Sequence, residues 1–107
     1  MKNNKPKILK EILYGFIRIH ILYHTAKRPF YGQELKEELE EHGYSISYGS
    51  LYPLLAKMEE ANYLSRKEVN VEGKIRKYYT ITETGKAIYK EALNKLKELN
   101  KEIFEEK

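Results

Sequence analysis

The sequence of 107 residues predicts a mainly α-helical domain that carries one small β-hairpin. Three observations predict this fold. Residues 47–59 have the apolar spacing of a helix and begin with small side chains. A basic segment with a turn signal follows at residues 72–79, and long helical patterns lie at both ends of the chain. The resulting order of helix, helix, helix, hairpin and helix is that of a winged helix-turn-helix with one further helix.

The first helix is expected over residues 8–24, after a basic arm of residues 1–7 that is expected to be flexible. The apolar side chains of this helix cover more than one stripe, and a helix that is apolar most of the way round has to be buried on both sides. A domain this small can hardly surround it. We therefore expect its second face, with Leu9, Leu13 and Phe16, to pack on a partner subunit.

The second helix is expected over residues 31–42, because Tyr31, Leu35 and Leu39 form one narrow apolar stripe and Gly43 can end a helix. Its outer side is rich in glutamate, which is typical of a solvated face.

The third helix is expected over residues 47–61, with Ser47 as its N-cap. Pro53 lies well inside this helix and is expected to bend it, since proline cannot donate a backbone hydrogen bond. The predicted buried face consists of Leu51, Leu54, Leu55 and Met58.

The hairpin is expected to consist of strands at residues 64–71 and 75–81, joined by a turn at residues 72–73. Alternation along the second strand turns Tyr79 and Ile81 toward the core.

The last helix is expected over residues 83–104, with Thr82 as its cap. Its apolar residues follow coiled-coil spacing over little more than two heptads, so they should dock on the first helix of a second subunit. The predicted contacts are Tyr89, Ala92, Leu96, Leu99 and Ile103. We therefore divide the chain into the arm (1–7), a winged-helix domain (8–82) and a dimerisation helix (83–107).

The composition favours an anionic partner and argues against catalysis. The formal net charge is +4 and the pI is about 9.1. Residues 1–28 hold seven Lys and Arg against one Glu, residues 29–63 hold two against seven, and residues 64–90 hold seven against three. Two basic blocks therefore flank an acidic one, which suits a surface that binds a polyanion at its ends.

The chain has neither Cys nor Asp, which removes disulfides, thiolate metal sites and the usual catalytic triads. We therefore expect no enzyme activity. The longest apolar stretch carries several charged residues and the amino terminus lacks the layout of a signal peptide, so a soluble cytoplasmic protein without a membrane span is predicted.

Three motifs resemble a known family. They are Tyr31-Gly32, residues 48–55 (YGSLYPLL) and residues 77–85 (KYYTITETG). With them, the chain resembles the PadR family of bacterial and archaeal transcriptional regulators over residues 8–90. The resemblance implies a dimer, joined through the last helix, that represses genes from pseudo-palindromic sites. The family often has Gly-Arg-Pro-Arg-Lys at the wing, whereas residues 73–77 here are GKIRK, which keeps the charge but implies a less rigid tip.

In a winged helix the third helix enters the major groove of DNA with its amino-terminal residues toward the bases. The exposed side of this helix has no Arg, Asn or Gln, so discrimination is expected to be modest and to rest on Ser50, Tyr52, thymine methyls and DNA shape. The predicted DNA contacts are Tyr48, Gly49, Ser50, Tyr52, Pro53 and Lys57 of the helix and Lys74, Arg76 and Lys77 of the wing. Further phosphate contacts are expected from Lys2, Lys5, Lys7 and Lys10.

Alternative interpretations stay open for several of these residues. Tyr48 and Tyr52 can be edges of the core, and the domain can be a winged helix that contacts only proteins, although its cationic wing argues against that.

His20 and His24 are four residues apart on one helix, a spacing that can chelate zinc. No convincing third ligand follows in the sequence, and His42 is the one candidate. Packing at an interface, or pairing with the helix dipole, is the commoner role of such histidines, so no metal and no cofactor are predicted.

The resemblance also implies a small aromatic or hydrophobic effector. Phe16, Tyr89 and Leu96 are candidates to line its site, although residues at this spacing more often form plain core.

Overall fold

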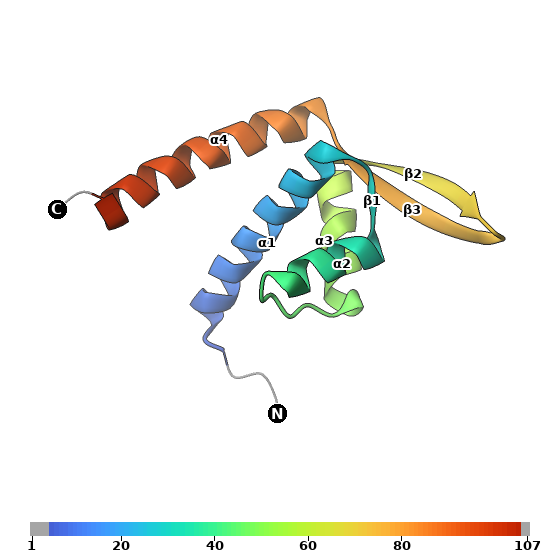
Figure 1. The fold of residues 1–107 in the computed structure, drawn as a ribbon, viewed down its shortest axis with the longest axis horizontal. Coiled ribbons are helices and arrows are strands. Elements are labelled where there is room, and N and C mark those ends of the chain that lie inside the picture. Colours follow the sequence, from blue (N-terminus) through green and yellow to red (C-terminus); the bar gives the residue numbers. More distant parts are fainter. Residues whose placement is uncertain (1–4, 106–107) are drawn as a thin grey trace.

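The computed structural model describes residues 5–105, and its elements confirm the predicted fold (Figure 1). Helices α1, α2 and α3 form the body, strands β2 and β3 project from it as a hairpin, and α4 projects in the opposite direction. The bounds are Lys7–Lys27 (α1), Phe30–Tyr31 (β1), Gly32–Glu41 (α2), Tyr48–Glu60 (α3), Leu64–Val71 (β2), Lys74–Ile81 (β3), Glu83–Asn100 (α4) and Lys101–Glu105 (a short π-helix, η1).

Local signals set the helix ends as predicted. At the start of α3 the Ser47 hydroxyl accepts a hydrogen bond from the backbone N–H of Ser50 at 3.2 Å. At the start of α4 the Thr82 hydroxyl accepts one from the N–H of Gly85 at 2.9 Å. Helix α2 ends before Gly43, whose φ of +89° is a conformation that side chains disfavour. Both N-caps satisfy backbone donors that would otherwise lack a partner.

The sheet corrects the prediction, because a third strand, β1, lies against the hairpin. Strand order is β1-β3-β2, and Phe30 and Tyr31 pair antiparallel with Tyr79 and Tyr78 of β3. The second helix therefore begins at Gly32 rather than at Tyr31, whose backbone is extended. A two-residue strand shows no alternation in the sequence, and its existence depends on pairing with residues far along the chain.

The hydrophobic core lies where α1, α2 and α3 meet the base of the sheet. Tyr79 and Ile81 of β3 face this core, which confirms the predicted alternation. The buried apolar residues are Ile17, Ile21, Leu22, Phe30, Leu35, Leu39, Ile46, Leu51, Leu54, Leu55, Met58, Leu64, Tyr79 and Ile81. The predicted buried face of α3 is part of this set.

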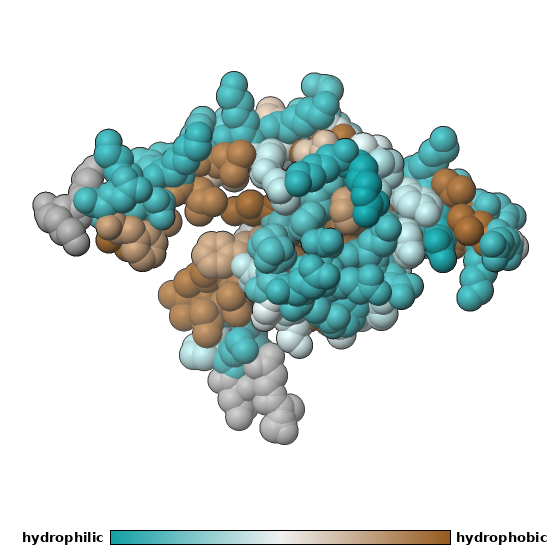
Figure 2. Space-filling view, in the orientation of Figure 1, coloured by the Kyte–Doolittle hydropathy of each residue, from teal (hydrophilic) through white to brown (hydrophobic). Residues whose placement is uncertain are grey.

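Large apolar side chains of α1 and α4 are left exposed (Figure 2). On α1 they include Leu9 and Phe16, and the helix continues to Lys27, beyond its predicted end at residue 24. On α4 Gly85 is the one buried residue among those described, and Leu99 is 48% exposed. Figures 1 and 2 show that the apolar side chains of the two helices border the open wedge between them.

Gly85 supplies a stability prediction, since a Cβ at this position would overlap the backbone carbonyl of Tyr63 and lie 2.8 Å from Cγ1 of Ile81. We expect Gly85→Ala to destabilise the fold by about 1–3 kcal/mol, as overpacked cores do, and to lower the melting temperature by roughly 4–8 °C per kcal/mol. Gly49→Ala is the matched control, because among the described residues its Cβ would meet Ser47 Oγ alone, at 3.7 Å. Equal melting temperatures for the two variants would contradict this account.

Candidate nucleic-acid interface

The amino-terminal half of α3 presents two exposed tyrosines side by side. Tyr48 and Tyr52 are 42% and 43% exposed, and their rings stack with centroids 5.7 Å apart and an interplanar angle of 21°. Exposed aromatic pairs one helical turn apart are available to a partner. The remaining part of each side chain is covered by the fold, so each tyrosine combines packing at the edge of the domain with an accessible surface.

The Tyr52 ring lies directly on the start of α2. A Cβ at Gly32 would lie 2.6 Å from Cζ of Tyr52, so any larger residue there would displace the ring from this position. This contact orients Tyr52 on the surface and joins the first turn of α2 to α3. The Tyr31-Gly32 motif and the Tyr48–Tyr52 pair are thus parts of one packing arrangement.

Other predicted contacts on α3 surround these rings. Gly49, Pro53 and Lys57 are exposed, and Ser50 is half-buried, with its Oγ 3.4 Å from Ser47 Oγ. Helix α3 is continuous through Pro53. The small residues at its start leave the first backbone N–H groups accessible to an anion.

The wing is hydrogen bonded as far as its turn. The β2–β3 ladder ends at the pair Val71–Lys74, and Glu72 and Gly73 have φ of 52° and 87°, as a two-residue hairpin turn requires. The Asn70 side chain accepts a hydrogen bond from the N–H of Gly73 at 2.9 Å. The tip is therefore a regular two-residue hairpin turn.

The three predicted wing cations lie in different surroundings. Lys74 and Lys77 are exposed, whereas Arg76 is half-buried with its guanidinium carbon 4.4 Å from the centroid of the Tyr31 ring. Tyr31 in turn contacts Tyr78 edge to face at 5.3 Å. A cation–π contact of this kind orients the guanidinium while leaving it charged. Strand β1, which the sequence did not predict, thus positions a wing arginine.

A groove of about 630 Å³ joins the wing to the starts of α2 and α3. Its lining brings together five of the predicted contacts, namely Tyr48, Tyr52, Lys74, Arg76 and Lys77. Tyr31, Gly32, Gln33 and Ile75 complete the lining. The groove therefore combines exposed aromatic rings with three cationic side chains, a chemistry suited to a nucleic-acid backbone and its bases.

Sequence reasoning missed two residues of α2 beside this groove. Gln33 lines it, and Lys36 Nζ lies 5.3 Å from the centroid of the Tyr48 ring. Because the two are three residues apart, they share one face of α2. That helix was interpreted as acidic and solvated, yet Gln33 supplies an amide of the kind that reads adenine, which the exposed side of α3 lacks. The Nε2 of Gln33 donates a hydrogen bond to Oε2 of Glu37 at 3.3 Å.

A second cleft, of about 770 Å³, separates the start of α1 from the loop before α3. Lys5 and Lys10 line it together with Ser47 and Ser50. Cationic side chains near a helix N-terminus add to its preference for anions. Lys2 of the expected arm lies outside the described residues. Lys57, a predicted DNA contact, does not line the groove of the wing but borders a cavity between α1, α3 and α4.

Three of the predicted dimer residues line the cleft between α1 and α4, and the others lie elsewhere on the two helices and on η1. An apolar cleft of about 440 Å³ there is lined by residues that include Phe16, Tyr89 and Leu96. Tyr89 packs partly against the chain's own core, and Leu13 and Ala92 are half-buried. Leu9, Leu99 and Ile103 are exposed.

A three-helix body with a cationic hairpin beside the start of the third helix defines the winged-helix class of DNA-binding folds. The sequence profile of the transcriptional regulator PadR-like family matches residues 21–91. The chain therefore belongs to the PadR-like family of transcriptional regulators, and it is not an enzyme.

Individual relatives agree with this assignment. The transcriptional regulator Rv3488 of Mycobacterium tuberculosis is 36% identical over 96 residues, which cover 90% of each chain. The structure of a PadR-like transcription factor from Bacteroides fragilis has a TM-score of 0.79 and 28% identity, over 92% of this chain and 96% of that one. A PadR family transcription regulator from hypervirulent Clostridium difficile has a TM-score of 0.74 and 27% identity, over 80% and 92%.

Among residues 5–105, none of the helices has both the length and the apolar character that spanning a bilayer requires.

Proposed function

We propose that the chain is a cytoplasmic homodimeric repressor that binds pseudo-palindromic operator DNA through α3 and the wing. The groove between Tyr52 and the wing cations carries this proposal, because one concave surface offers aromatic rings and three positive charges. In a winged helix this surface faces the duplex, with the start of α3 in the major groove and the wing along the backbone.

Sequence discrimination is expected to come from the start of α3 and from α2. Ser50 and Tyr52 offer hydroxyl groups, and Gln33 beside them offers an amide donor and acceptor. The wing cations Lys74 and Lys77 contact phosphates, which position the protein without reading sequence. The same division assigns Arg76, oriented by Tyr31, to the phosphate backbone or the minor groove.

The homodimer is proposed from the uncovered apolar surface. Leu99 and Ile103 of α4 and Leu9 of α1 are exposed in a single chain, and residues of this kind are stabilised by burial. Packing α4 of one subunit into the α1–α4 wedge of its partner covers the exposed apolar side chains of both helices. A two-fold dimer then presents two reading helices to half-sites on one side of the duplex, which explains a pseudo-palindromic operator.

An effector is proposed for the apolar cleft between α1 and α4. Phe16, Tyr89 and Leu96 line it, with a mainly apolar surface that suits a small aromatic or hydrophobic compound. Because α1 and α4 also carry the proposed dimer contacts, such a compound acts where the spacing of the two reading helices is set.

A gel shift with DNA from the promoter region of the chain's own gene tests operator binding. We expect a retarded complex at concentrations at which random DNA of equal length is free, since specific regulators bind operators about 10³–10⁷-fold more tightly. Equal binding to operator and random DNA would refute sequence-specific regulation, and no binding to either would favour a winged helix that contacts only proteins.

Two substitutions separate the proposed roles. Lys74→Ala is expected to weaken binding to every DNA sequence to a similar extent, because it removes a phosphate contact. Tyr52→Ala is expected to reduce the preference for operator over random DNA by about 1–3 kcal/mol, because it removes a group that faces the bases. Fluorescence anisotropy with operator DNA and with random DNA measures the two affinities. Tyr52→Phe removes only the hydroxyl group and so separates its contribution from that of the ring. A uniform loss from both alanine variants would contradict the division of roles.

A further inference from the structure

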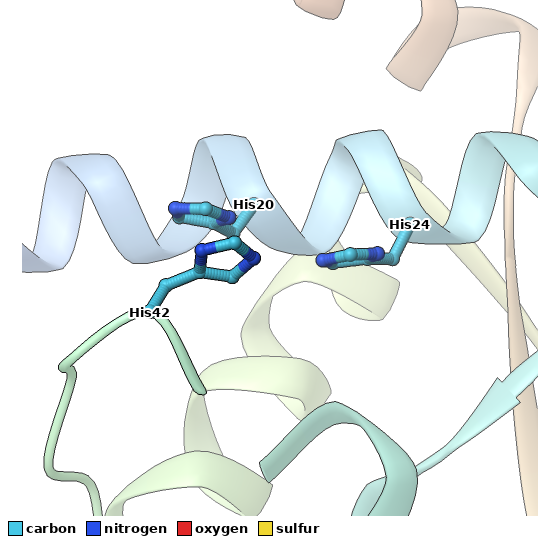
Figure 3. A group of neighbouring side chains, drawn as sticks. All are labelled: His20, His24 and His42. Carbon is cyan, nitrogen blue, oxygen red and sulfur yellow. The ribbon is translucent and has the colours of Figure 1, made fainter. Parts of the chain in front are cut away.

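All three histidines of the chain meet at one place between α1 and the end of α2 (Figure 3). His20 and His24 come from α1, and His42 follows α2. One ring nitrogen from each lies within 4.8 Å of the other two. The rings of His20 and His42 stack with centroids 5.0 Å apart, and Figure 3 shows the His24 ring directed toward them.

The fold positions each histidine independently of the others. His20 and His24 share a face of α1 because they are four residues apart. His42 is held by the stop of α2, where the N–H of Gly43 donates to the carbonyl of Glu40 and the N–H of Tyr44 donates to that of Leu39, both at 3.0 Å. This double hydrogen bond is the Schellman arrangement, which fixes the direction of the chain after a helix. The cluster is therefore attached to one face of α1 and to the well-defined end of α2.

His24 carries the strongest sign of a missing ligand. The residue is only 7% exposed, and its Nε2 is buried without a hydrogen-bond partner among the described residues. A buried polar atom without a partner has lost its hydration without replacement, so it calls for a compensating interaction. The nearest carboxylate oxygen, Oε1 of Glu38, lies 3.7 Å from it, beyond hydrogen-bonding distance.

Glu38 lies beside one of the three nitrogens, with its Oε1 3.7 Å from Nε2 of His24, and it has to move closer to the group that the three imidazoles form in order to bind the same ion. It lies four residues before His42, on the same face of α2. Two ligand pairs with helical spacing, His20 with His24 and Glu38 with His42, thus face each other from two helices. Three imidazoles and one carboxylate form a donor set that suits Zn²⁺, which takes four nitrogen, sulfur or oxygen ligands.

Zinc binding sets requirements on the distances and on the protonation state. Tetrahedral ligands about 2.0–2.1 Å from zinc are roughly 3.3 Å apart, so the stacked rings of His20 and His42 have to turn until a nitrogen of each points at the common ion. Burial lowers the pKa of His20 and of His24, and the neighbouring His42 lowers both further, while Glu38 opposes this. The neutral imidazole is the form that binds metals.

We propose that His20, His24, His42 and Glu38 bind one Zn²⁺ ion per chain. Bound zinc connects α1, which carries the exposed apolar face, to α2, which packs on the reading helix α3. Ordinary aromatic packing is the alternative role of the cluster, since His24 also contacts Phe30 and Tyr23. That role leaves Nε2 of His24 without a partner, whereas a metal ion provides one.

Zinc titration of the untagged, chelator-treated chain tests the proposal without any DNA. We expect calorimetry to give one saturable Zn²⁺ ion per chain. The melting temperature should rise on the order of 10 °C at a zinc concentration of about 100 times Kd, while Mg²⁺, which prefers oxygen ligands, should have no effect. Co²⁺ should give the visible absorption of a tetrahedral complex. A chain that binds no zinc, or whose melting temperature zinc leaves unchanged, would overturn the proposal.

Substitutions assign the ligands. His42 is exposed, so His42→Gln should fold normally and yet weaken zinc binding by more than the roughly 10–100-fold that loss of an outer-sphere partner costs. His20→Gln should have the same effect, and both variants should keep the melting temperature of the metal-free protein. Glu41→Gln is the control, because its exposed side chain neighbours His42 and lies outside the cluster. Unchanged zinc affinity in both histidine variants would assign the ion elsewhere and refute the site.

Discussion

Raising the salt concentration from about 50 to about 200 mM should weaken DNA binding by the dimer by about 10³–10⁵-fold. The reason is that each phosphate neutralised by a lysine or arginine releases a condensed counterion, and salt opposes that release. The exposed wing cations Lys74 and Lys77 contribute, as do Lys5 and Lys10 in the cleft near the start of α3. Doubled by the two-fold axis, these side chains reach on the order of 6–10 phosphates.

The measurement is fluorescence anisotropy with labelled operator DNA over a series of salt concentrations. Replacing Lys74 and Lys77 by alanine should make the plot of log affinity against log salt shallower, by about 0.9 for each phosphate contact that is lost. Lys95→Ala is the control, since this lysine lies on α4, away from the groove. An affinity that stays constant over this range of salt would exclude the electrostatic interface described above.

The second large effect is expected from Leu99→Glu, which should convert the dimer to a monomer. Leu99 is 48% exposed in the single chain, so the change costs little in the isolated fold, but it places a charge in the proposed apolar interface. A monomer engages one half-site at a time. Loss of the linked second contact is expected to lower operator affinity by about 10²–10⁴-fold.

Sedimentation velocity gives the oligomeric state, and the gel shift gives the affinity. Asn94→Glu makes the same change of charge on the same helix, but its position lies on the opposite side from the apolar seam, so it should leave both properties unchanged. If Leu99→Glu remains dimeric, the interface does not involve this face of α4. A monomer with undiminished operator affinity would show instead that dimerisation is not needed for recognition.

These two effects and the zinc site involve separate parts of the chain. The wing and α3 face the proposed duplex, and α4 faces the proposed partner. The histidine cluster lies between α1 and α2, which connect the two regions. Zinc binding, oligomeric state and DNA affinity can therefore be measured separately in the same protein.

Much of the fold is predictable from local patterns. Ser47 and Thr82 mark helix starts because a side-chain oxygen can satisfy nearby N–H groups, and the apolar face of α3 repeats with the period of a helix. The turn of the wing is also a local property, because residues 72–73 need positive φ. Such features depend on residues within a few positions of one another, so the linear order suffices to find them.

The candidate sites are different, since they join residues that are distant in sequence. Only the folded chain brings Gln33 to the groove of Tyr52, sets Arg76 on the Tyr31 ring and adds His42 to the histidines of α1. Each of these contacts depends on the angle at which two elements pack, and that angle results from many side chains of the core together. Periodicity and spacing carry no record of it. Strand β1 therefore became evident only in three dimensions, and the sequence could name His42 as a candidate ligand but could not place it beside His20 and His24.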